Sequence, residues 1–394
     1  MILYIIIHMD YTDIFISNKT SFVILFFILI FLILISLFYL KYKEKIEAFM
    51  RLYNKTPKEV ENYLNSYELL YSRKRDIQLN DLNDWKNNVP LKGYKPPDRA
   101  EGTEELYKVL HDGIILGDLD KMYIPNFLGK TTDIIENQLL IEKKMADHLN
   151  VKPNDKLLEL GCGSGAIAMT MYKNTKCHIT AINIDEDTLE KGRKKLKKSG
   201  NDKIILKYQD LNQPLDFPDN SIDGVYEIQA VTFSEDLGAL MKELYRVLKP
   251  GKRVVMLDGV ILDKFDKNDP KDLKRGLSIR GLTAGGGNWH PNYWDKAAKD
   301  AGFTVKVSTC GDKHDHHYAD ELPVLKDINK FFWNIRDWMR FLTSWYILPK
   351  HLSIIFDRIT ENANYMIELE EEHKLTTDYL FVYEKPSESK NKNK

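Results

Sequence analysis

Three glycines at alternate positions directly follow an apolar run, and no other feature restricts the fold of this chain as strongly. They lie in the stretch Lys156-Leu-Leu-Glu-Leu-Gly-Cys-Gly-Ser-Gly165. The apolar run predicts a buried strand. Gly161, Gly163 and Gly165 predict a tight turn, because glycine adopts positive φ without a Cβ penalty. Backbone N–H groups of such a turn, at the start of a helix, can approach a polar ligand closely. The stretch therefore predicts a strand–turn–helix unit that binds a nucleoside-like molecule.

Polar residues follow the next two apolar runs at the spacing of an α/β unit. Residues 177–185 predict a second strand that ends in Asn183 and Asp185. An α/β unit places its ribose-binding group at this point. Residues 204–212 predict a third strand followed by Asp210, whose carboxylate can accept a hydrogen bond from an exocyclic amine such as that of adenine.

The chain after residue 212 continues to alternate strands and helices. Residues 222–228 predict a fourth strand, and residues 237–248 have the apolar spacing of a helix. This helix is expected to end at Lys249-Pro-Gly251, because proline cannot continue it. Residues 253–258 then predict a buried fifth strand, and residues 131–149 have the apolar periodicity of a helix.

The order of these motifs resembles that of the class I S-adenosylmethionine-dependent methyltransferases. The motifs are LELGCGSG, AINID, YQDLNQPLDFPDNSIDGVYEIQA and ELYRVLKPGKRVVMLD, within about residues 130–310. The resemblance implies a Rossmann-like α/β fold, a mostly parallel seven-stranded sheet with helices on both faces, and S-adenosyl-L-methionine as cofactor. The alternative is a dinucleotide-binding domain, which has the spacing G-x-G-x-x-G in place of the G-x-G-x-G found here.

The same resemblance implies a role for each cofactor motif. The glycine turn and Glu159 would hold the methionine part of the cofactor. Asn183 or Asp185 would bind the ribose, and Asp210 with Leu211 the adenine.

Within the family, the chain resembles the sterol C-methyltransferase branch. The similar stretches are Ala181-Ile-Asn183, Val225-Tyr-Glu-Ile-Gln-Ala230, Leu257-Asp-Gly-Val-Ile-Leu-Asp-Lys-Phe-Asp-Lys-Asn-Asp-Pro270 and the closing residues 375–386. Alkylation of a sterol double bond leaves a carbocation, which carboxylates or aromatic faces stabilise. The resemblance implies Glu227 and Asp258 as the catalytic carboxylates and Tyr226 as a catalytic aromatic face, with Glu227 also a cofactor contact. Each of the three is alternatively a strand-end or core residue without a catalytic role.

Two departures from the sterol branch keep other functions open. Gln229 and Phe233 stand where that branch has an acidic residue and a histidine. One alternative is N-methylation of a phospholipid headgroup precursor or another small molecule. A second is a membrane protein that binds the cofactor without catalysis. Tyr107, Tyr123 and Asn126 are expected substrate contacts or packing residues over the cofactor.

An apolar run near the N-terminus predicts attachment to a membrane. Residues 22–40 are interrupted only by Ser36, and a helix of this length crosses about 30 Å of hydrocarbon. A cleaved signal peptide has basic residues before a shorter apolar core. Here one lysine precedes the run, and the basic residues that follow are Lys41, Lys43, Lys45 and Arg51. The charges predict a single-pass protein with a cytosolic catalytic domain, in the endoplasmic reticulum if the cell is eukaryotic.

A second region, residues 331–355, interleaves aromatic and basic residues. Such a mixture suits a membrane interface. A membrane span is not expected, because Arg336, Asp337 and Arg340 would lie in hydrocarbon. The region predicts either a monotopic membrane segment or a cap over a hydrophobic substrate.

Composition excludes several classes of partner. The chain has 57 Lys and Arg and 58 Asp and Glu, for a net charge of −1, whereas nucleic-acid-binding proteins are usually basic. No nucleic-acid partner is expected. Cys162, Cys177 and Cys310 are too scattered for a disulfide framework. The segment from Cys310 to His317 offers a thiol and three imidazoles, but the spacing does not fit a closed tetrahedral site, so no metal is expected.

The predicted organisation has six parts. They are a short N-terminal segment (1–20), a transmembrane helix (21–41), a stalk and linker (42–100), the methyltransferase domain (101–310), an aromatic and amphipathic substrate cap with the closing strand (311–386) and a disordered tail (387–394).

Overall fold

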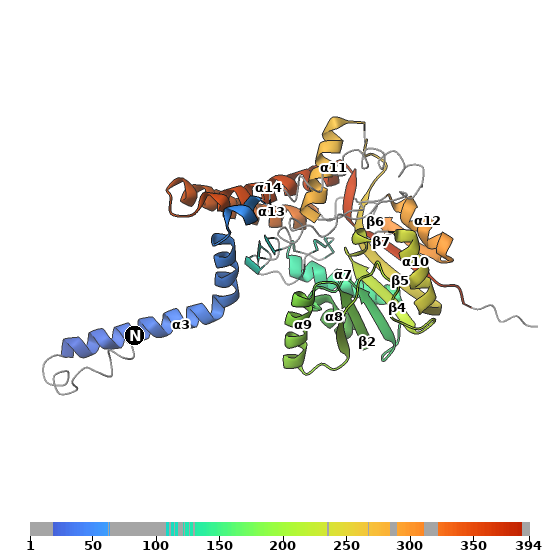
Figure 1. The fold of residues 1–394 in the computed structure, drawn as a ribbon, viewed down its shortest axis with the longest axis horizontal. Coiled ribbons are helices and arrows are strands. Elements are labelled where there is room, and N and C mark those ends of the chain that lie inside the picture. The colour runs from blue at the N-terminus through green and yellow to red at the C-terminus, as the bar shows by residue number, and fades with distance from the viewer. Residues whose placement is uncertain are drawn as a thin grey trace, which may run out of the picture.

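The central sheet of this protein positions the candidate site. The structure is a computed structural model. It describes residues 19–61, 63, 108–109, 112–113, 115–116, 121, 123–125, 127–128, 131–234, 236–266, 268–283, 290–310 and 322–387. In this part of the chain, seven strands form one sheet in the order β3-β2-β1-β4-β5-β7-β6 (Figure 1). The strands are β1 (Lys156–Leu160), β2 (His178–Asn183), β3 (Ile204–Tyr208), β4 (Ile222–Ile228), β5 (Leu248–Ile261), β6 (Thr304–Cys310) and β7 (Leu375–Glu384).

The strand directions confirm the prediction of a mostly parallel sheet. β1 pairs in parallel with β2 and with β4, and the β2–β3 and β4–β5 pairs are also parallel. Only β7 is reversed, because it is antiparallel to both β5 and β6. The carboxyl ends of β1 to β5 therefore meet at one edge, which is where α/β sheets bind ligands.

Helices cover both faces of the sheet and bury its apolar side chains. On one face, α10 (Leu237–Val247) and α12 (Pro291–Ala301) enclose a core that includes Leu244, Trp294 and Phe381. On the other face, α7 (Ile134–Leu149), α8 (Ala166–Thr175) and α9 (Glu186–Ser199) enclose a core that includes Met145 and Val255. Both faces of the sheet are therefore covered by helices and shielded from water, as is usual for parallel sheets.

Side chains at the helix starts explain where several helices begin. Asp133 caps α7, Asp185 caps α9 and Asp236 caps α10, in each case by accepting hydrogen bonds from backbone N–H groups of the first turn. These N–H groups have no partner within the helix, so an aspartate at this position stabilises the start by about 1 kcal/mol. His290 caps α12 in the same way, followed by Pro291 at the first helical position.

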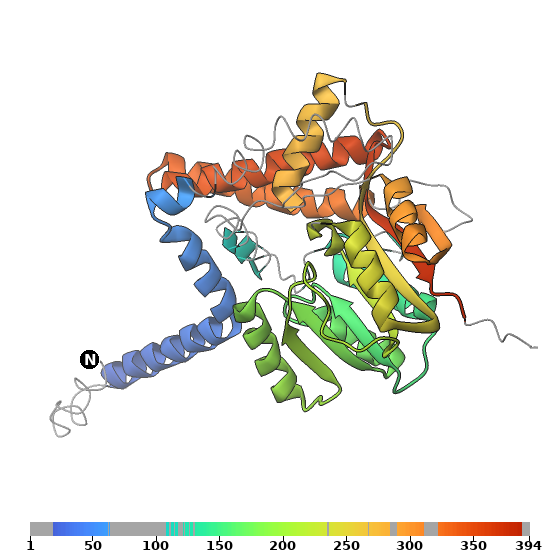
Figure 2. The same ribbon diagram turned by 45° about the vertical axis from the view of Figure 1, so that its right-hand side comes forward.

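Three further helices lie at the carboxyl end of the parallel strands. They are α11 (Pro270–Thr283), α13 (Leu322–Ser344) and α14 (Lys350–Glu371), and α13 and α14 form an antiparallel hairpin (Figure 2). An apolar cluster that includes Phe265, Met366 and Leu375 joins α11, α13 and α14 to the ends of β5 and β7.

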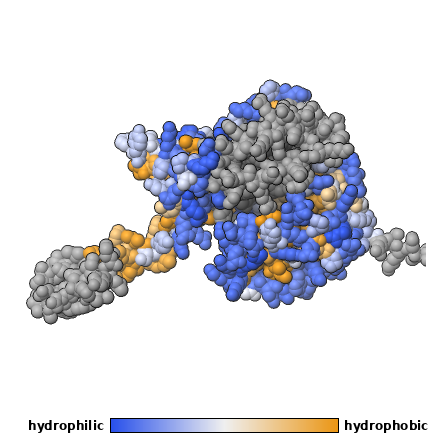
Figure 3. Space-filling model, in the orientation of Figure 1, coloured by the Kyte–Doolittle hydropathy of each residue, from blue (hydrophilic) through white to orange (hydrophobic). Residues whose placement is uncertain are grey.

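The first described helix, α3 (Lys19–Tyr53), extends away from the sheet and bends at Tyr42. Its side chains are described from Ile28 onward, and the large apolar ones from there to Leu40 are between 36% and 68% exposed (Figure 3). Within the described residues, no helix combines the length and apolar character required to cross a membrane. The prediction of a transmembrane helix at residues 21–41 is therefore not supported.

Candidate functional site

The glycine turn forms as predicted between β1 and α8. Gly161, Gly163 and Gly165 have φ values of 68°, 52° and 77°, all in the left-handed region that favours glycine. The Cys162 N–H donates to the Ile182 carbonyl at 3.0 Å and thereby joins the turn to β2. Gly165 is the N-cap of α8 and has no side chain to cap the first turn. The start of α8 is thus available to a polar ligand.

The three glycines serve different purposes. A Cβ at Gly161 would lie 2.3 Å from the Ala230 Cβ, and a Cβ at Gly165 would lie 2.9 Å from Leu206 Cδ2. Packing thus requires glycine at Gly161, whereas at Gly165 the Leu206 side chain can shift and the φ of 77° is the main reason for glycine. A Cβ at Gly163 would meet no atom within 4 Å. The middle of the turn therefore faces open space, which fits a cofactor that approaches the backbone closely.

The residues expected to bind ribose and adenine lie at neighbouring strand ends. Asn183 is the last residue of β2 and is half-buried, and Asp210 lies two residues beyond β3. The Asp210 carboxylate accepts a hydrogen bond from the Asn212 N–H at 2.9 Å, and Leu211 packs against the core beneath α10. Asp185 is exposed and caps α9, with Oδ2 accepting from the Thr188 hydroxyl at 2.5 Å. Its carboxylate is therefore used within the protein to cap α9.

Glu159 and Tyr226 form a buried pair beneath the turn. They are neighbours in the β1–β4 register, and the Tyr226 hydroxyl donates to Glu159 Oε2 at 2.7 Å. Burial raises the pKa of Glu159 from 4.5 to about 8, although the hydrogen bond from Tyr226 opposes this shift. Burial and the neighbouring Glu159 also raise the pKa of Tyr226 well above 10. The Tyr226 ring is therefore committed to the core, which supports the alternative interpretation of this residue over a catalytic aromatic face.

The raised pKa of Glu159 predicts a pH dependence of stability. The folded protein holds this proton more tightly than the unfolded chain, so the contribution to stability is full below pH 4.5 and is lost as the pH rises through about 8. We expect Glu159→Gln, which keeps a hydrogen-bond acceptor for Tyr226, to make the free energy of unfolding fall less steeply between pH 5 and 8. Urea unfolding across this range measures the slope, and an unchanged slope would contradict the assignment.

Glu227 and Asp258 form a second buried pair at the carboxyl ends of β4 and β5. Glu227 Oε2 accepts from the Ala230 and Val231 N–H groups at 2.8 and 3.2 Å, and Asp258 Oδ2 accepts from the Thr232 N–H at 3.0 Å. Burial and then the charge of Asp258 raise the pKa of Glu227 well above 4.5. Burial raises the pKa of Asp258 to about 7, although backbone N–H groups oppose it. Near neutral pH the pair therefore holds at least one proton.

One atom of this pair has no partner in the protein. Among the described residues, Glu227 Oε1 is buried and makes no hydrogen bond, although Oε2 of the same carboxyl makes two. A buried polar atom without a partner needs an explanation, and a catalytic role is one of those known. Glu227 and Asp258 are thus brought together as expected, with one oxygen left for a ligand or a proton.

A third buried network was not found from the sequence. Glu142 of α7 is fully buried, accepts from Lys121 at 2.6 and 2.8 Å, and accepts from the Tyr123 hydroxyl at 2.7 Å. Tyr123, one of the expected substrate contacts, is therefore held in this network. One sequence signal points to this network. Glu142 lies at helical spacing from Gln138 and next to Ile141, on the side of α7 that faces the core.

Several expected residues cannot be placed. Tyr107, Asn126, the side chain of Phe233 and most of the segment from Cys310 to His317 lie outside the described residues. Gln229, which stands in place of an acid, donates from Nε2 to the Thr377 carbonyl at 3.0 Å. Its amide is thus used to join the end of β4 to β7. In the described part of the chain, no group of three or more metal-ligating side chains occurs.

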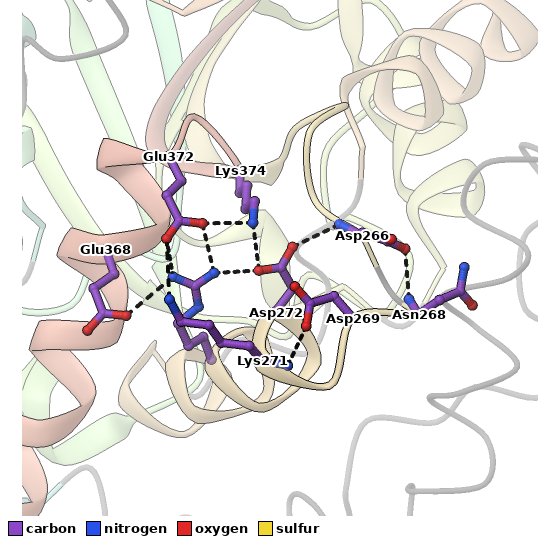
Figure 4. Close-up of polar contacts among 9 residues, drawn as sticks. Asp266, Asn268, Asp269, Lys271, Asp272, Glu368, Glu372 and Lys374 are labelled. Atoms are coloured by element: carbon purple, nitrogen blue, oxygen red, sulfur yellow. Dashed lines mark hydrogen bonds and ion pairs between the residues drawn. The ribbon is translucent and has the colours of Figure 1, made fainter.

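Ion pairs fasten α11 to α14 beside the site (Figure 4). Arg275 is 1% exposed and contacts Glu372 Oε1 at 2.6 Å, Glu368 Oε2 at 3.3 Å and Asp272. Lys374 contacts Asp272 at 2.8 Å and Glu372 at 2.7 Å. These contacts link α11, the end of α14 and the start of β7. The helix that follows the Asp258 strand is thereby held in one position.

Comparison with known proteins identifies this architecture. Residues 158–256 match the methyltransferase domain family. The chain is 32% identical over 176 residues to the 24-methylenesterol C-methyltransferase 2 of Arabidopsis thaliana, which is 42% of this chain and 46% of that relative. It is 24% identical over 326 residues to the sterol 24-C-methyltransferase of Kluyveromyces lactis, which is 77% of this chain and 86% of that relative.

A solved structure shows the same fold at low identity. The cyclopropane synthase MmaA2 of Mycobacterium tuberculosis superposes with a TM-score of 0.54 at 14% identity, over 67% of this chain and 90% of that one. The chain spans about half the length of several curated relatives that it matches, including 55% of the Saccharomyces cerevisiae sterol 24-C-methyltransferase. The chain thus contains a class I S-adenosylmethionine-dependent methyltransferase domain, and this domain resembles that of the sterol methyltransferase branch.

Proposed function

We propose that this protein transfers a methyl group from S-adenosylmethionine to a lipid, and that the acceptor is an electron-rich carbon of a sterol side chain. The observation that carries the proposal is the pair of buried carboxyls, Glu227 and Asp258, next to the glycine turn, with Glu227 Oε1 free of hydrogen bonds among the described residues. The similarity to sterol methyltransferases supports the same acceptor.

In this proposal, the chain's own residues place the cofactor. The N–H groups of the glycine turn and the start of α8 bind its polar groups, with Glu159 beneath the methionine part. Asn183 binds the ribose, and Asp210 with Leu211 binds the adenine. S-adenosylmethionine supplies a methyl group on a cationic sulfur. Much of the rate then comes from holding this group against the acceptor, because fixed orientation removes an entropic barrier.

The buried carboxyl pair would handle the charge that alkylation creates. Addition of a methyl group to a carbon–carbon double bond leaves a carbocation on the acceptor. A carboxylate stabilises this cation in a dry site and can accept the proton whose loss restores a double bond. Because the Asp258 pKa is raised to about 7, the pair becomes an effective base only as the pH passes neutrality.

A conservative variant tests the role of Glu227. In Glu227→Gln, the amide oxygen can take over the hydrogen bonds from Ala230 and Val231, and the amide nitrogen occupies the position of Oε1. We expect kcat to fall about 100-fold, in the range found for general acid–base groups. In the wild type, kcat should rise through about pH 7 as Asp258 ionises, and Asp258→Asn should remove this rise.

Asp295→Asn is a matched control for that measurement. Asp295 of α12 also has a raised pKa because of burial, and it accepts from the Tyr383 hydroxyl at 3.0 Å. It lies on a covering helix away from the strand ends. Its replacement should leave the pH profile of kcat unchanged. Wild-type kcat in Glu227→Gln together with an unchanged profile in Asp258→Asn would remove the carboxyl pair from the mechanism.

The acceptor is tested with the full chain, radiolabelled S-adenosylmethionine and a panel of sterols, phospholipids and ethanolamine derivatives. Label in an extracted sterol establishes C-methylation of this class. Label in a headgroup product overturns the sterol assignment and favours N-methylation. Cofactor binding without transfer to any member of the panel overturns both.

We also propose that α3 attaches the domain to a membrane. The exposed apolar side chains from Ile28 to Leu40 support this proposal, since monomeric soluble proteins seldom expose a continuous patch of this kind. Lys41 and Lys43 follow the patch and are exposed, which suits a negatively charged membrane surface. Flotation of the full chain with phospholipid vesicles measures the attachment.

A further inference from the structure

The α13–α14 hairpin has a row of exposed aromatic side chains on its outer face. Trp338 and Phe341 of α13 and Trp345, directly after the helix, are 63%, 51% and 68% exposed and follow one another at intervals of three and four residues. The ring centroids of Trp338 and Phe341 are 6.1 Å apart, and those of Phe341 and Trp345 are 6.2 Å apart. Tyr346 and Ile347, 95% and 62% exposed, continue the row into the turn. These five residues are called the hairpin tip.

The fold does not need the hairpin tip for its own core. The inward side of α13 packs on α14 and α3 through a separate apolar cluster, in which Ile335 and Met339 lie against Leu352, Phe356 and Leu52. Loss of the tip side chains would leave this cluster intact. The outward aromatic residues therefore remain in contact with water, which is unfavourable in free energy. Burial of these residues against an external partner would remove this unfavourable term.

The backbone of the turn holds the tip in a defined shape. Tyr346 has a φ of 56°, a left-handed conformation that costs a residue with a side chain about 1–2 kcal/mol. The Tyr346 N–H donates to the Thr343 carbonyl at 3.2 Å, and the Ile347 N–H donates to the Leu342 carbonyl at 3.0 Å. The turn is thus hydrogen-bonded, and Tyr346 projects from it.

The hairpin tip and the apolar part of α3 extend from the same side of the sheet domain. Figures 1 and 2 show both of them on this side in two orientations. The second half of α3 is fixed to the hairpin, because Leu52 packs in the shared cluster and its carbonyl lies 3.0 Å from His351 Nε2. The exposed apolar part of α3 is therefore joined to the hairpin through this second half, with the bend at Tyr42 between them.

The charges near the tip suit an anionic surface. Arg340 of α13 pairs with Asp357 of α14 at 2.7 Å, and Arg336 pairs with Asp337 at 2.7 Å, so these acidic groups are neutralised within the hairpin. Lys350 is exposed at the start of α14, directly after the turn. Trp and Tyr rings favour the headgroup level of a bilayer, and nearby lysines are attracted to anionic lipids.

We propose that the hairpin tip is a second membrane contact, which inserts at the headgroup level of a bilayer that contains anionic phospholipids. This inference rests on the proposed membrane attachment of α3. A single helix allows the domain to rotate about its axis, whereas a second contact on the hairpin restricts this rotation. The tip therefore sets how the sheet domain faces the lipid surface.

Flotation of the full chain tests the proposal, with vesicles of phosphatidylcholine and about one-fifth phosphatidylserine. We expect Trp345→Ser, Tyr346→Ser and Ile347→Ser together to lower the vesicle partition coefficient about tenfold, from the apolar area withdrawn from the interface. The matched control replaces three exposed apolar residues of the sheet domain, Ile135, Leu139 and Ile205, by serine. This control should bind vesicles as the wild type does.

Vesicles with brominated acyl chains provide a second readout that is independent of affinity. Bromine near the headgroups should quench the tryptophan fluorescence of the wild type, and Trp338→Phe with Trp345→Phe should remove most of this quenching. If the wild type floats but the tip variant floats equally well and is quenched to the same extent, the hairpin proposal is overturned while the α3 attachment stands. If the wild type does not float, the α3 attachment itself fails. A tip variant that changes only the oligomeric state would identify a protein interface instead.

Discussion

We expect Arg275→Met to lower the free energy of unfolding by about 3 kcal/mol, the lower end of the range for breaking a buried ion pair. Arg275 is almost fully buried among Asp272, Glu368 and Glu372, and methionine fills similar space without a charge. Asp272 would then keep Lys374 as its remaining cationic partner, at 2.8 Å. This remaining pair is the reason to expect the lower end of the range. Urea unfolding at neutral pH measures the loss.

The effect of Arg275→Met should depend on pH in a defined direction. Hydrogen bonds from Arg275 and then Lys374 lower the pKa of Glu372 from 4.5 to about 2. Burial opposes the ionisation of Asp272, but Lys374, the Asp266 N–H and Arg275 outweigh it and hold its pKa below the ordinary value. Stability from these carboxylates is present above pH 4.5 and is lost as the pH falls toward 2. The difference between wild type and variant should therefore shrink over that range.

Lys271→Met is the control for this prediction. Lys271 contacts the same Glu372 at 3.8 Å, but its side chain is 66% exposed. Exposed pairs contribute about 0–1 kcal/mol. Equal losses in Lys271→Met and Arg275→Met would show that burial of the network does not matter, which would contradict the role assigned to Arg275.

The second large effect is expected for Gly161→Ala, with a loss of about 2–5 kcal/mol in the free energy of unfolding. A φ of 68° costs alanine about 1–2 kcal/mol. Its Cβ would also lie 2.3 Å from the Ala230 Cβ, and relief of such an overlap costs about 1–3 kcal/mol more. Because the Ala230 N–H donates to Glu227, a shift of Ala230 also disturbs the carboxyl pair. Both the affinity for S-adenosylmethionine and kcat should therefore fall, as calorimetry and turnover assays can measure.

Gly163→Ala separates backbone strain from ligand contact within the same turn. Its φ of 52° carries a similar backbone penalty, but its Cβ would meet no protein atom within 4 Å. We expect a stability loss of only about 1–2 kcal/mol. The affinity for S-adenosylmethionine should fall by more than this loss accounts for, because the added methyl group enters the space beside the turn. Wild-type affinity in Gly163→Ala would show that the turn does not hold the cofactor.

Local patterns were sufficient to predict the sheet and the glycine turn. A buried strand, a turn that needs positive φ and a helix start are each specified within about ten residues, so β1, Gly161 to Gly165 and α8 could be read directly. The strands after them carry the same kind of short-range signal. Fold class, cofactor and the neighbourhood of Glu227 and Asp258 at adjoining strand ends all follow from the order of such units.

Other features depend on contacts between distant parts of the chain. The sequence alone offered Asn183 or Asp185 for the ribose and Tyr226 as a catalytic or core residue. The capping of α9 by Asp185 and the hydrogen bond from the Tyr226 hydroxyl to Glu159 are visible only in the structure. Glu142 and Arg275 could not be found because their partners, Lys121 and Glu372, are 21 and 97 residues away.

The amino-acid sequence by itself thus determined the class I methyltransferase fold and its cofactor turn, because backbone preference and apolar periodicity act over a few residues. Only the tertiary structure decided which carboxyls are buried together, which glycine faces open space and which aromatic residues of α13 point outward. Burial and electrostatic coupling are properties of pairs that folding brings together, and they set the pKa values and exposed surfaces on which the chemistry depends.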